Sequence, residues 1–117
     1  MGTPRRPVLL TVDDNRAIHE VYAVAFARDY THLRAHGGTE ALEILRSQTI
    51  DVMVLDLKMR EPTGLEVLKR ARELRPSLII VISSVINSSQ STLRAIRLGA
   101  ADYFVKLRRL VNEPADN

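Results

Sequence analysis

The sequence contains no cysteine among its 117 residues, and only 4% of them are aromatic. The absence of cysteine excludes disulfide bonds, thiolate metal sites and thiol nucleophiles, and it fits a reducing, cytoplasmic setting. No stretch approaches the roughly 20 consecutive apolar residues of a membrane-spanning helix. The basic N-terminus precedes only a short apolar run, which ends at Asp13, and this is not the pattern of a signal peptide. We therefore expect no membrane association.

The charge is nearly balanced, with 17 basic and 14 acidic residues and a formal net charge of +3. The arginines are scattered through every segment rather than clustered. Single-stranded nucleic acid is usually bound by clustered basic residues with aromatic side chains between them, and aromatic residues are scarce here. The sequence therefore predicts no direct binding of nucleic acid by this domain. The three histidines show no metal-ligand spacing and are interpreted as surface or helix residues.

Apolar residues make up 45% of the chain, which suffices for one compact domain. Continuous apolar runs, typical of strands buried on both faces, predict strands at 8–12, 51–55 and 78–82, with shorter strands at 31–35 and 103–105. Amphipathic helices are expected between them. The first helix is expected to turn Ile18, Val21, Tyr22, Ala25 and Phe26 inward, and the second, with an N-cap at Thr39, Ala41, Leu42 and Leu45. The third is expected to end at Pro76 and to turn Leu65, Leu68, Ala71 and Leu74 inward. The fourth is expected to turn Leu93 and Ile96 inward and to end with a C-cap at Gly99.

Strict alternation of such strands and helices predicts an α/β fold with a parallel sheet covered on both faces. In these sheets the functional site lies beyond the carboxyl ends of the strands. The polar residues at those ends are Asp13, Asp14, Asp56, Ser83 and Lys106. Three neighbouring carboxylates repel one another unless a cation neutralises them, and Mg²⁺ suits such oxygen ligands. A lysine and a serine beside them are suitable donors to a bound anion, so the pattern indicates a metal-assisted phosphate site.

From Val8 to Lys106 the chain resembles a receiver domain of a bacterial two-component response regulator. The matching segments are LLTVDDN, DVMVLDLKM with Gly64 eight residues beyond Asp56, RPSLIIVISS and LGAADYFVK. The resemblance implies a flavodoxin-like three-layer sandwich with strand order 2-1-3-4-5 and a short or truncated fifth helix. It also implies a receiver domain at 8–112, a disordered basic tail at 1–7, and a C-terminal tail or the start of a linker at 113–117.

The resemblance assigns Asp56 as the phosphoacceptor. It also implies that Asp13, Asp14, Asp56 and the backbone carbonyl of Lys58 hold Mg²⁺. The implied function is a phosphorylation-dependent signalling switch in a phosphorelay, with a sensor histidine kinase or phosphotransfer protein as the donor. The chain would then catalyse only its own phosphorylation and dephosphorylation.

The resemblance further implies that Lys106 and Ser83 contact the phosphoryl group, and that Ser83 and Tyr103 move as the switch. The fourth strand could instead be shifted so that Ser84 supplies the hydroxyl. We favour Ser83 because the residue after the hydroxyl is usually small in this family, and Val85 is not. The output domain or downstream protein is expected outside this chain, and a phosphorylation-dependent homodimer is a further possibility.

Four features depart from the family pattern. Leu107 replaces the usual proline after Lys106, Pro62 is displaced within the loop after Asp56, the switch hydroxyl has two candidates, and Pro114 leaves little room for a fifth helix. Two alternatives follow. One is a pseudo-receiver that is not phosphorylated and acts as a protein-interaction module. The other is a small phosphatase of the haloacid dehalogenase type, which normally has a second acid where this chain has Lys58.

Overall fold

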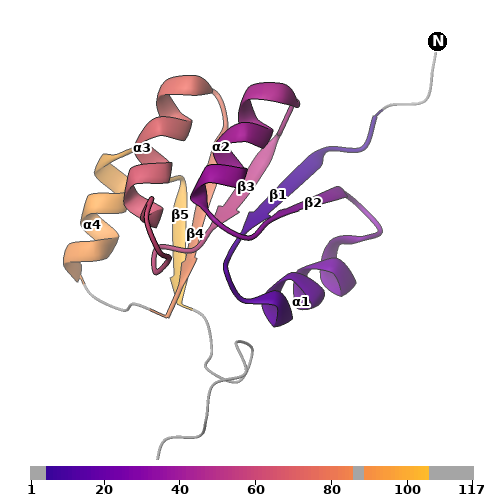
Figure 1. Cartoon of the computed structure of the whole chain (residues 1–117), viewed down its shortest axis with the longest axis horizontal. Coiled ribbons are helices and arrows are strands. Elements are labelled where there is room, and N and C mark those ends of the chain that lie inside the picture. Colours follow the sequence, from indigo (N-terminus) through magenta and orange to yellow (C-terminus); the bar gives the residue numbers. More distant parts are fainter. Residues whose placement is uncertain (1–4, 86–88, 106–117) are drawn as a thin grey trace, which may run out of the picture.

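The computed structural model describes residues 5–85 and 89–105 of the chain. Their strands form one parallel sheet in the order β2-β1-β3-β4-β5 (Figure 1). The strands are β1 (Val8–Val12), β2 (Thr31–Ala35), β3 (Val52–Leu55), β4 (Ile79–Ser84) and β5 (Asp102–Val105). The helices are α1 (Arg16–Phe26), α2 (Gly38–Ser47), α3 (Gly64–Leu74) and α4 (Ser89–Arg97). The predicted alternation and the 2-1-3-4-5 order are confirmed, whereas the expected fifth helix falls outside the described residues.

Helices cover both faces of the sheet (Figure 1). One face packs against α2, α3 and α4, and its core includes Leu10, Met53, Leu55, Ile80 and Ile82 from the strands. The other face packs against α1. The smaller cluster there consists of Leu9, Ile18, Tyr22 and Val54. The continuous apolar strands β1 and β3 therefore supply side chains to both faces, as expected for a doubly covered parallel sheet.

Two helices differ in detail from the expectation. Helix α2 has Gly37 as its N-cap instead of Thr39, because the Gly37 carbonyl already accepts a hydrogen bond from the amide of Ala41. In α4, Leu93 and Ile96 are 48% and 52% exposed, while Ala95 is completely buried. The small Ala95 side chain contacts the core, so the more apolar pair lies on the outer side. The prediction of an inward Leu93 and Ile96 was wrong.

The other helices largely follow the prediction. Ile18 and Tyr22 of α1 are buried and Phe26 is half-buried, although Val21 and Ala25 are exposed. A capping box begins α3: the Thr63 hydroxyl accepts a hydrogen bond from the Glu66 amide, and the Glu66 carboxylate accepts one from the Thr63 amide.

The guanidinium of Arg72, on α3, ties together three segments at the amino ends of β4 and β5. It donates hydrogen bonds to the carbonyls of Pro76 and Leu78 at 2.7 Å, and to the carbonyl of Gly99 at 2.6 Å. Gly99 follows α4 with a φ of +105°, which is the left-handed C-terminal position expected from the sequence. A single side chain thus joins α3, the start of β4 and the end of α4.

The register of the sheet brings the carboxyl ends of its central strands together. Val12 pairs with Leu55, and Leu55 pairs with Ile82. The backbone ladder continues one residue farther, because the Asp13 amide donates to the Ala35 carbonyl at 3.1 Å and the Asp56 amide donates to the Val12 carbonyl at 3.0 Å. The polar residues that follow β1 and β3 are therefore fixed by the sheet itself.

Candidate functional site

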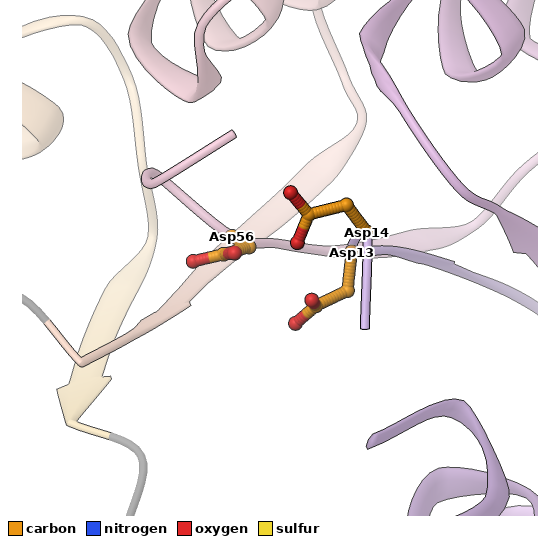
Figure 2. A group of neighbouring side chains, drawn as sticks. All are labelled: Asp13, Asp14 and Asp56. Atoms are coloured by element: carbon orange, nitrogen blue, oxygen red, sulfur yellow. The ribbon is translucent and has the colours of Figure 1, made fainter. Parts of the chain in front are cut away.

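Three carboxylates meet at this edge of the sheet. Asp13 and Asp14 follow β1, and Asp56 follows β3 (Figure 2). One carboxylate oxygen from each residue lies within 4.8 Å of the others. Asp13 and Asp56 are only 2% and 5% exposed, whereas Asp14 is exposed. This is an all-oxygen donor set with one open side, and it is compatible with a hard divalent cation such as Mg²⁺.

Local hydrogen bonds orient the two buried carboxylates. The Asp13 carboxylate accepts a hydrogen bond from the Asn15 amide at 2.9 Å, and the Asp56 carboxylate accepts one from the Lys58 amide at 3.2 Å. The Asn15 side chain in turn accepts from the Ala17 amide at 2.8 Å and caps α1. The Lys58 side chain is exposed, and its backbone belongs to the turn that carries Asp56.

Gly64, the first residue of α3, allows this helix to approach the backbone of Asp56 and Leu57 closely. A Cβ atom at Gly64 would collide with the Leu57 backbone and the Asp56 carbonyl. The Gly64 amide also donates a hydrogen bond to the Leu57 carbonyl at 3.2 Å. The start of α3 can therefore pack directly against the turn after Asp56, and this explains why a glycine stands eight residues beyond that aspartate.

Ser83 and Ser84 are both buried, at 1% and 0% exposure, but they belong to opposite faces of the sheet. The pairing of Leu55 with Ile82 places Ser83 next to Asp56 at the ends of adjacent strands. Side chains alternate along a strand, so Ser84 projects toward the other face. This arrangement supports the choice of Ser83 as the hydroxyl beside Asp56.

Tyr103 lies on β5, paired with Ile82 of β4. Burial raises the pKa of its phenol, a hydrogen bond with the Thr92 side chain opposes that rise, and the charge of Asp56 adds to it. The phenol is thus close enough to Asp56 to sense its charge, and it is also tied to α4. Lys106 and Leu107 lie outside the described residues.

A chain of hydrogen bonds that was not predicted from the sequence leads to Asp13. His19 does lie on a helix, as interpreted, but it is completely buried. Its Nε2 donates to the Asp13 carbonyl at 2.8 Å, since a carbonyl can only accept. In the neutral ring Nδ1 then accepts from the Thr11 hydroxyl at 2.8 Å, and the Thr11 oxygen accepts from His32 Nε2 at 2.7 Å.

Electrostatics favour the neutral form of both rings. Burial lowers the pKa of His19 despite its hydrogen bond to the Asp13 backbone, and the neighbouring charge of His36 contributes to the lowering. The pKa of His32 is also lowered, first by burial and then by the charge of Arg34. The sequence signal for this network was a single polar residue, Thr11, inside the otherwise apolar run VLLTV.

A second missed residue is Tyr22. Its hydroxyl donates a hydrogen bond to Ser83 Oγ at 2.9 Å. The only signal in the sequence was its position on the inward face of α1, which indicated an apolar role for its ring.

A hollow of about 560 Å³ adjoins the exposed carboxylate of Asp14. Its lining includes His36 and Gly37 before α2, the first turn of α2, and Arg60 and Glu61 before α3. The carboxylate cluster is therefore approachable from this side. Among the described residues, no helix has the length and apolarity needed to cross a membrane.

Comparisons with known proteins agree with this geometry. Residues 9–112 match the family model of the response regulator receiver domain. The transcriptional regulatory protein ZraR of Escherichia coli K12 is 32% identical over 100 residues, and the response regulator MprA of Mycobacterium ulcerans is 35% identical over 99. Each alignment covers 84% of this chain, but only 22% of ZraR and 43% of MprA. The chain thus spans less than half the length of these relatives.

The fold is also similar to that of a Burkholderia pseudomallei response regulator whose crystal structure contains a phosphorylated aspartic acid, a calcium ion and citrate. The TM-score is 0.81 at 25% sequence identity, over 86% of this chain and 59% of that one. Family model, relatives and fold therefore agree with the strand-end carboxylates, and the chain belongs to the response regulator receiver domain family.

Proposed function

We propose that this receiver domain accepts a phosphoryl group on Asp56 from a sensor histidine kinase or a phosphotransfer protein, with Mg²⁺ as cofactor. The observation that carries the proposal is the meeting of the Asp13, Asp14 and Asp56 carboxylate oxygens within 4.8 Å at the carboxyl ends of the strands. The phosphorylated aspartic acid of the Burkholderia pseudomallei relative supports it.

The residues present fit the cation. Asp13, Asp14 and Asp56 offer carboxylate oxygens, and the Lys58 carbonyl is the fourth proposed protein ligand. When bound, Mg²⁺ would offset part of the negative charge of the three carboxylates and of the transferring phosphoryl group. The hydrogen bonds from the Asn15 and Lys58 amides hold the Asp13 and Asp56 carboxylates in the orientations that bring their oxygens together.

The proposed reaction is a direct transfer. A carboxylate oxygen of Asp56 forms a bond to phosphorus while the phosphorus–nitrogen bond of the donor phosphohistidine breaks, and the electron pair of that bond leaves on the histidine nitrogen. Ser83 and Lys106 are the proposed hydroxyl and ammonium donors to the phosphoryl oxygens. Water later hydrolyses the acyl phosphate, so the domain catalyses only its own phosphorylation and dephosphorylation.

The switch follows from the added charge. A phosphoryl group brings about −1.5 to −2 charges to the sheet edge and attracts the Ser83 hydroxyl. Tyr103, tied to Thr92 and sensitive to the Asp56 charge, is the proposed second moving group. The output domain or downstream protein would read this change, with a phosphorylation-dependent homodimer as one form of output. We place this activity in the cytoplasm, with no direct role for nucleic acid or membrane.

The test is incubation of the chain with acetyl phosphate and Mg²⁺, followed by intact-mass measurement. We expect one phosphoryl group on the wild type and none on Asp56→Asn or in the presence of a chelator. Asp29→Asn, an exposed acid far from the site in sequence, is the matched control and should be phosphorylated normally. A wild-type chain that accepts no phosphoryl group from acetyl phosphate, and that does not bind beryllofluoride with Mg²⁺, would overturn the proposal and favour a pseudo-receiver.

A further inference from the structure

The contact between Tyr22 and Ser83 joins residues that are 61 positions apart in the chain. Tyr22 lies on α1 and is 8% exposed, and Ser83 lies near the carboxyl end of β4 and is 1% exposed. Side chains on a helix tilt toward its N-terminus. The N-terminus of α1 follows directly from Asp13 and Asp14, so this tilt carries the phenol toward the edge of the sheet that holds the carboxylates.

The three groups share one face of the sheet. Val54 belongs to the cluster packed against α1, and Asp56, two residues farther along the same backbone, points to the same side. Val54 pairs with Val81, so Ser83, two residues beyond Val81, also faces α1. The Tyr22 hydroxyl therefore reaches Ser83 on the face where Asp56 presents its carboxylate.

The direction of the hydrogen bond decides what Ser83 can do. A serine hydroxyl has one proton and two acceptor lone pairs. Because Tyr22 donates to Ser83 Oγ, the bond occupies a lone pair and not the proton. A phosphoryl group on Asp56 would offer only acceptor oxygens to its neighbours, and so requires that proton. A hydrogen bond donated to the serine oxygen also polarises the serine O–H group, and this strengthens the hydrogen bond that the serine itself donates.

We propose that Tyr22 is a positioning residue for the phosphorylated site: its hydroxyl holds Ser83 as a hydrogen-bond donor toward the phosphoryl group of Asp56 and so prolongs the lifetime of the acyl phosphate. This inference rests on the proposed function of Asp56. It assigns to α1 a contribution to the phosphorylated state that is separate from the carboxylates and acts only through Ser83.

The test is a double-mutant cycle on phosphoryl lifetime. In Tyr22→Phe we expect the phosphoryl group on Asp56 to be lost about two- to tenfold faster than in the wild type, the range that corresponds to one ordinary hydrogen bond. Beryllofluoride should bind more weakly by a similar factor, while the affinity for Mg²⁺ alone should not change. A purely structural role for the phenol would not separate these two affinities.

Two controls isolate the contact. Tyr30→Phe removes the hydroxyl of another tyrosine packed against the same apolar cluster and should leave the lifetime unchanged. In a Ser83→Ala background, Tyr22→Phe should have no further effect, because the group through which it acts is gone. Thermal unfolding of each variant establishes that the comparison is made between folded chains.

The results distinguish a failure of this inference from a failure of the proposed phosphorylation of Asp56. A longer lifetime in Tyr22→Phe, an unchanged lifetime, or an equal effect in the Ser83→Ala background would overturn the inference while leaving Asp56 phosphorylation intact. A wild-type chain that is never phosphorylated would overturn both proposals. If Tyr22→Phe does not fold, NMR of ring-labelled tyrosine in the wild type replaces it: the Tyr22 signal should shift when beryllofluoride binds, and should not shift in Ser83→Ala.

Discussion

Asp13 does more at the residue scale than supply a carboxylate. Its backbone carbonyl accepts the proton of His19 Nε2, and this fixes the direction of every hydrogen bond behind it. His19 must accept from Thr11, and Thr11 must accept from His32. The network therefore holds the turn at Asp13 in place only while the rings of His19 and His32 keep these tautomers.

Stability should fall as the pH drops below about 6.5, in part because of His32. Its pKa is lowered from 6.5 in the folded chain, so near and below pH 6.5 the unfolded chain binds more protons than the folded one. The contribution of His32 is thus fully present above the unfolded pKa and is lost as the pH falls toward the folded pKa. Urea unfolding from pH 7.5 to 5.5 should show this slope, and His32→Gln should reduce it. An NMR titration that places the His32 pKa at or above 6.5 would contradict the explanation.

The three carboxylates could be predicted from the sequence, but His19 and Tyr22, which contact Asp13 and Ser83, could not. Asp13, Asp14 and Asp56 were predictable because an acid directly after a buried strand must lie at the carboxyl edge of a parallel sheet. His19 and Tyr22 were not predictable in the same way. Their roles depend on contacts with Thr11 and Ser83 across the packed α1 interface, and no local period in the sequence encodes such a contact.

At the scale of elements, Gly64 allows α3 to pack directly against the turn after Asp56. We expect Gly64→Ala to lower the free energy of unfolding by about 1–3 kcal/mol, since its Cβ would collide with the Leu57 backbone and the Asp56 carbonyl. Phosphorylation from acetyl phosphate should also slow, because relief of the collision moves the phosphoacceptor turn.

Gly37→Ala provides the matched comparison. Nothing lies within 4 Å of a Cβ at Gly37, and its φ of −174° is ordinary extended backbone. Gly37 is the N-cap of α2, where glycine is preferred over alanine, so a loss of up to about 1 kcal/mol is expected, smaller than that of Gly64→Ala. If chemical unfolding showed equal losses of stability in the two alanine variants, a steric collision with the backbone of Asp56 and Leu57 would not be the cause of the loss in Gly64→Ala.

The order and type of the elements were predictable because continuous apolar runs alternate with amphipathic segments throughout the chain. The errors concern the ends and faces of helices. In α2 a backbone carbonyl of Gly37 begins the helix, although Thr39 has the better capping side chain. In α4 the buried position is taken by Ala95, and periodicity alone cannot show that a small residue is preferred there over Leu93 and Ile96.

At the scale of the whole molecule, Arg72 joins segments that the sheet ladder does not connect. Replacing it by Met keeps most of the apolar stem but removes the donors to Leu78 and Gly99, which are part-buried contacts. We expect a loss of about 2 kcal/mol, because hydrogen bonds from charged groups are stronger than neutral ones. Urea unfolding measures it.

Arg70→Met is the control for this variant. Arg70 lies on the same helix and is exposed, so its replacement should change stability by less than about 0.5 kcal/mol. If Arg72→Met were equally harmless, the three segments would have to be held by the apolar core alone.

The attachment of α1 bears on how this domain could be recombined with its relatives. The apolar cluster beneath α1 is small among the described residues, and the polar contacts that accompany it include those from His19 to β1 and from Tyr22 to β4. A chimaera that received α1 from another receiver would lose both contacts unless Thr11, His32 and Ser83 were exchanged with it. Helix α1 and its partner residues on three strands would therefore have to be transferred as one unit, although they are scattered over more than 70 positions of the chain.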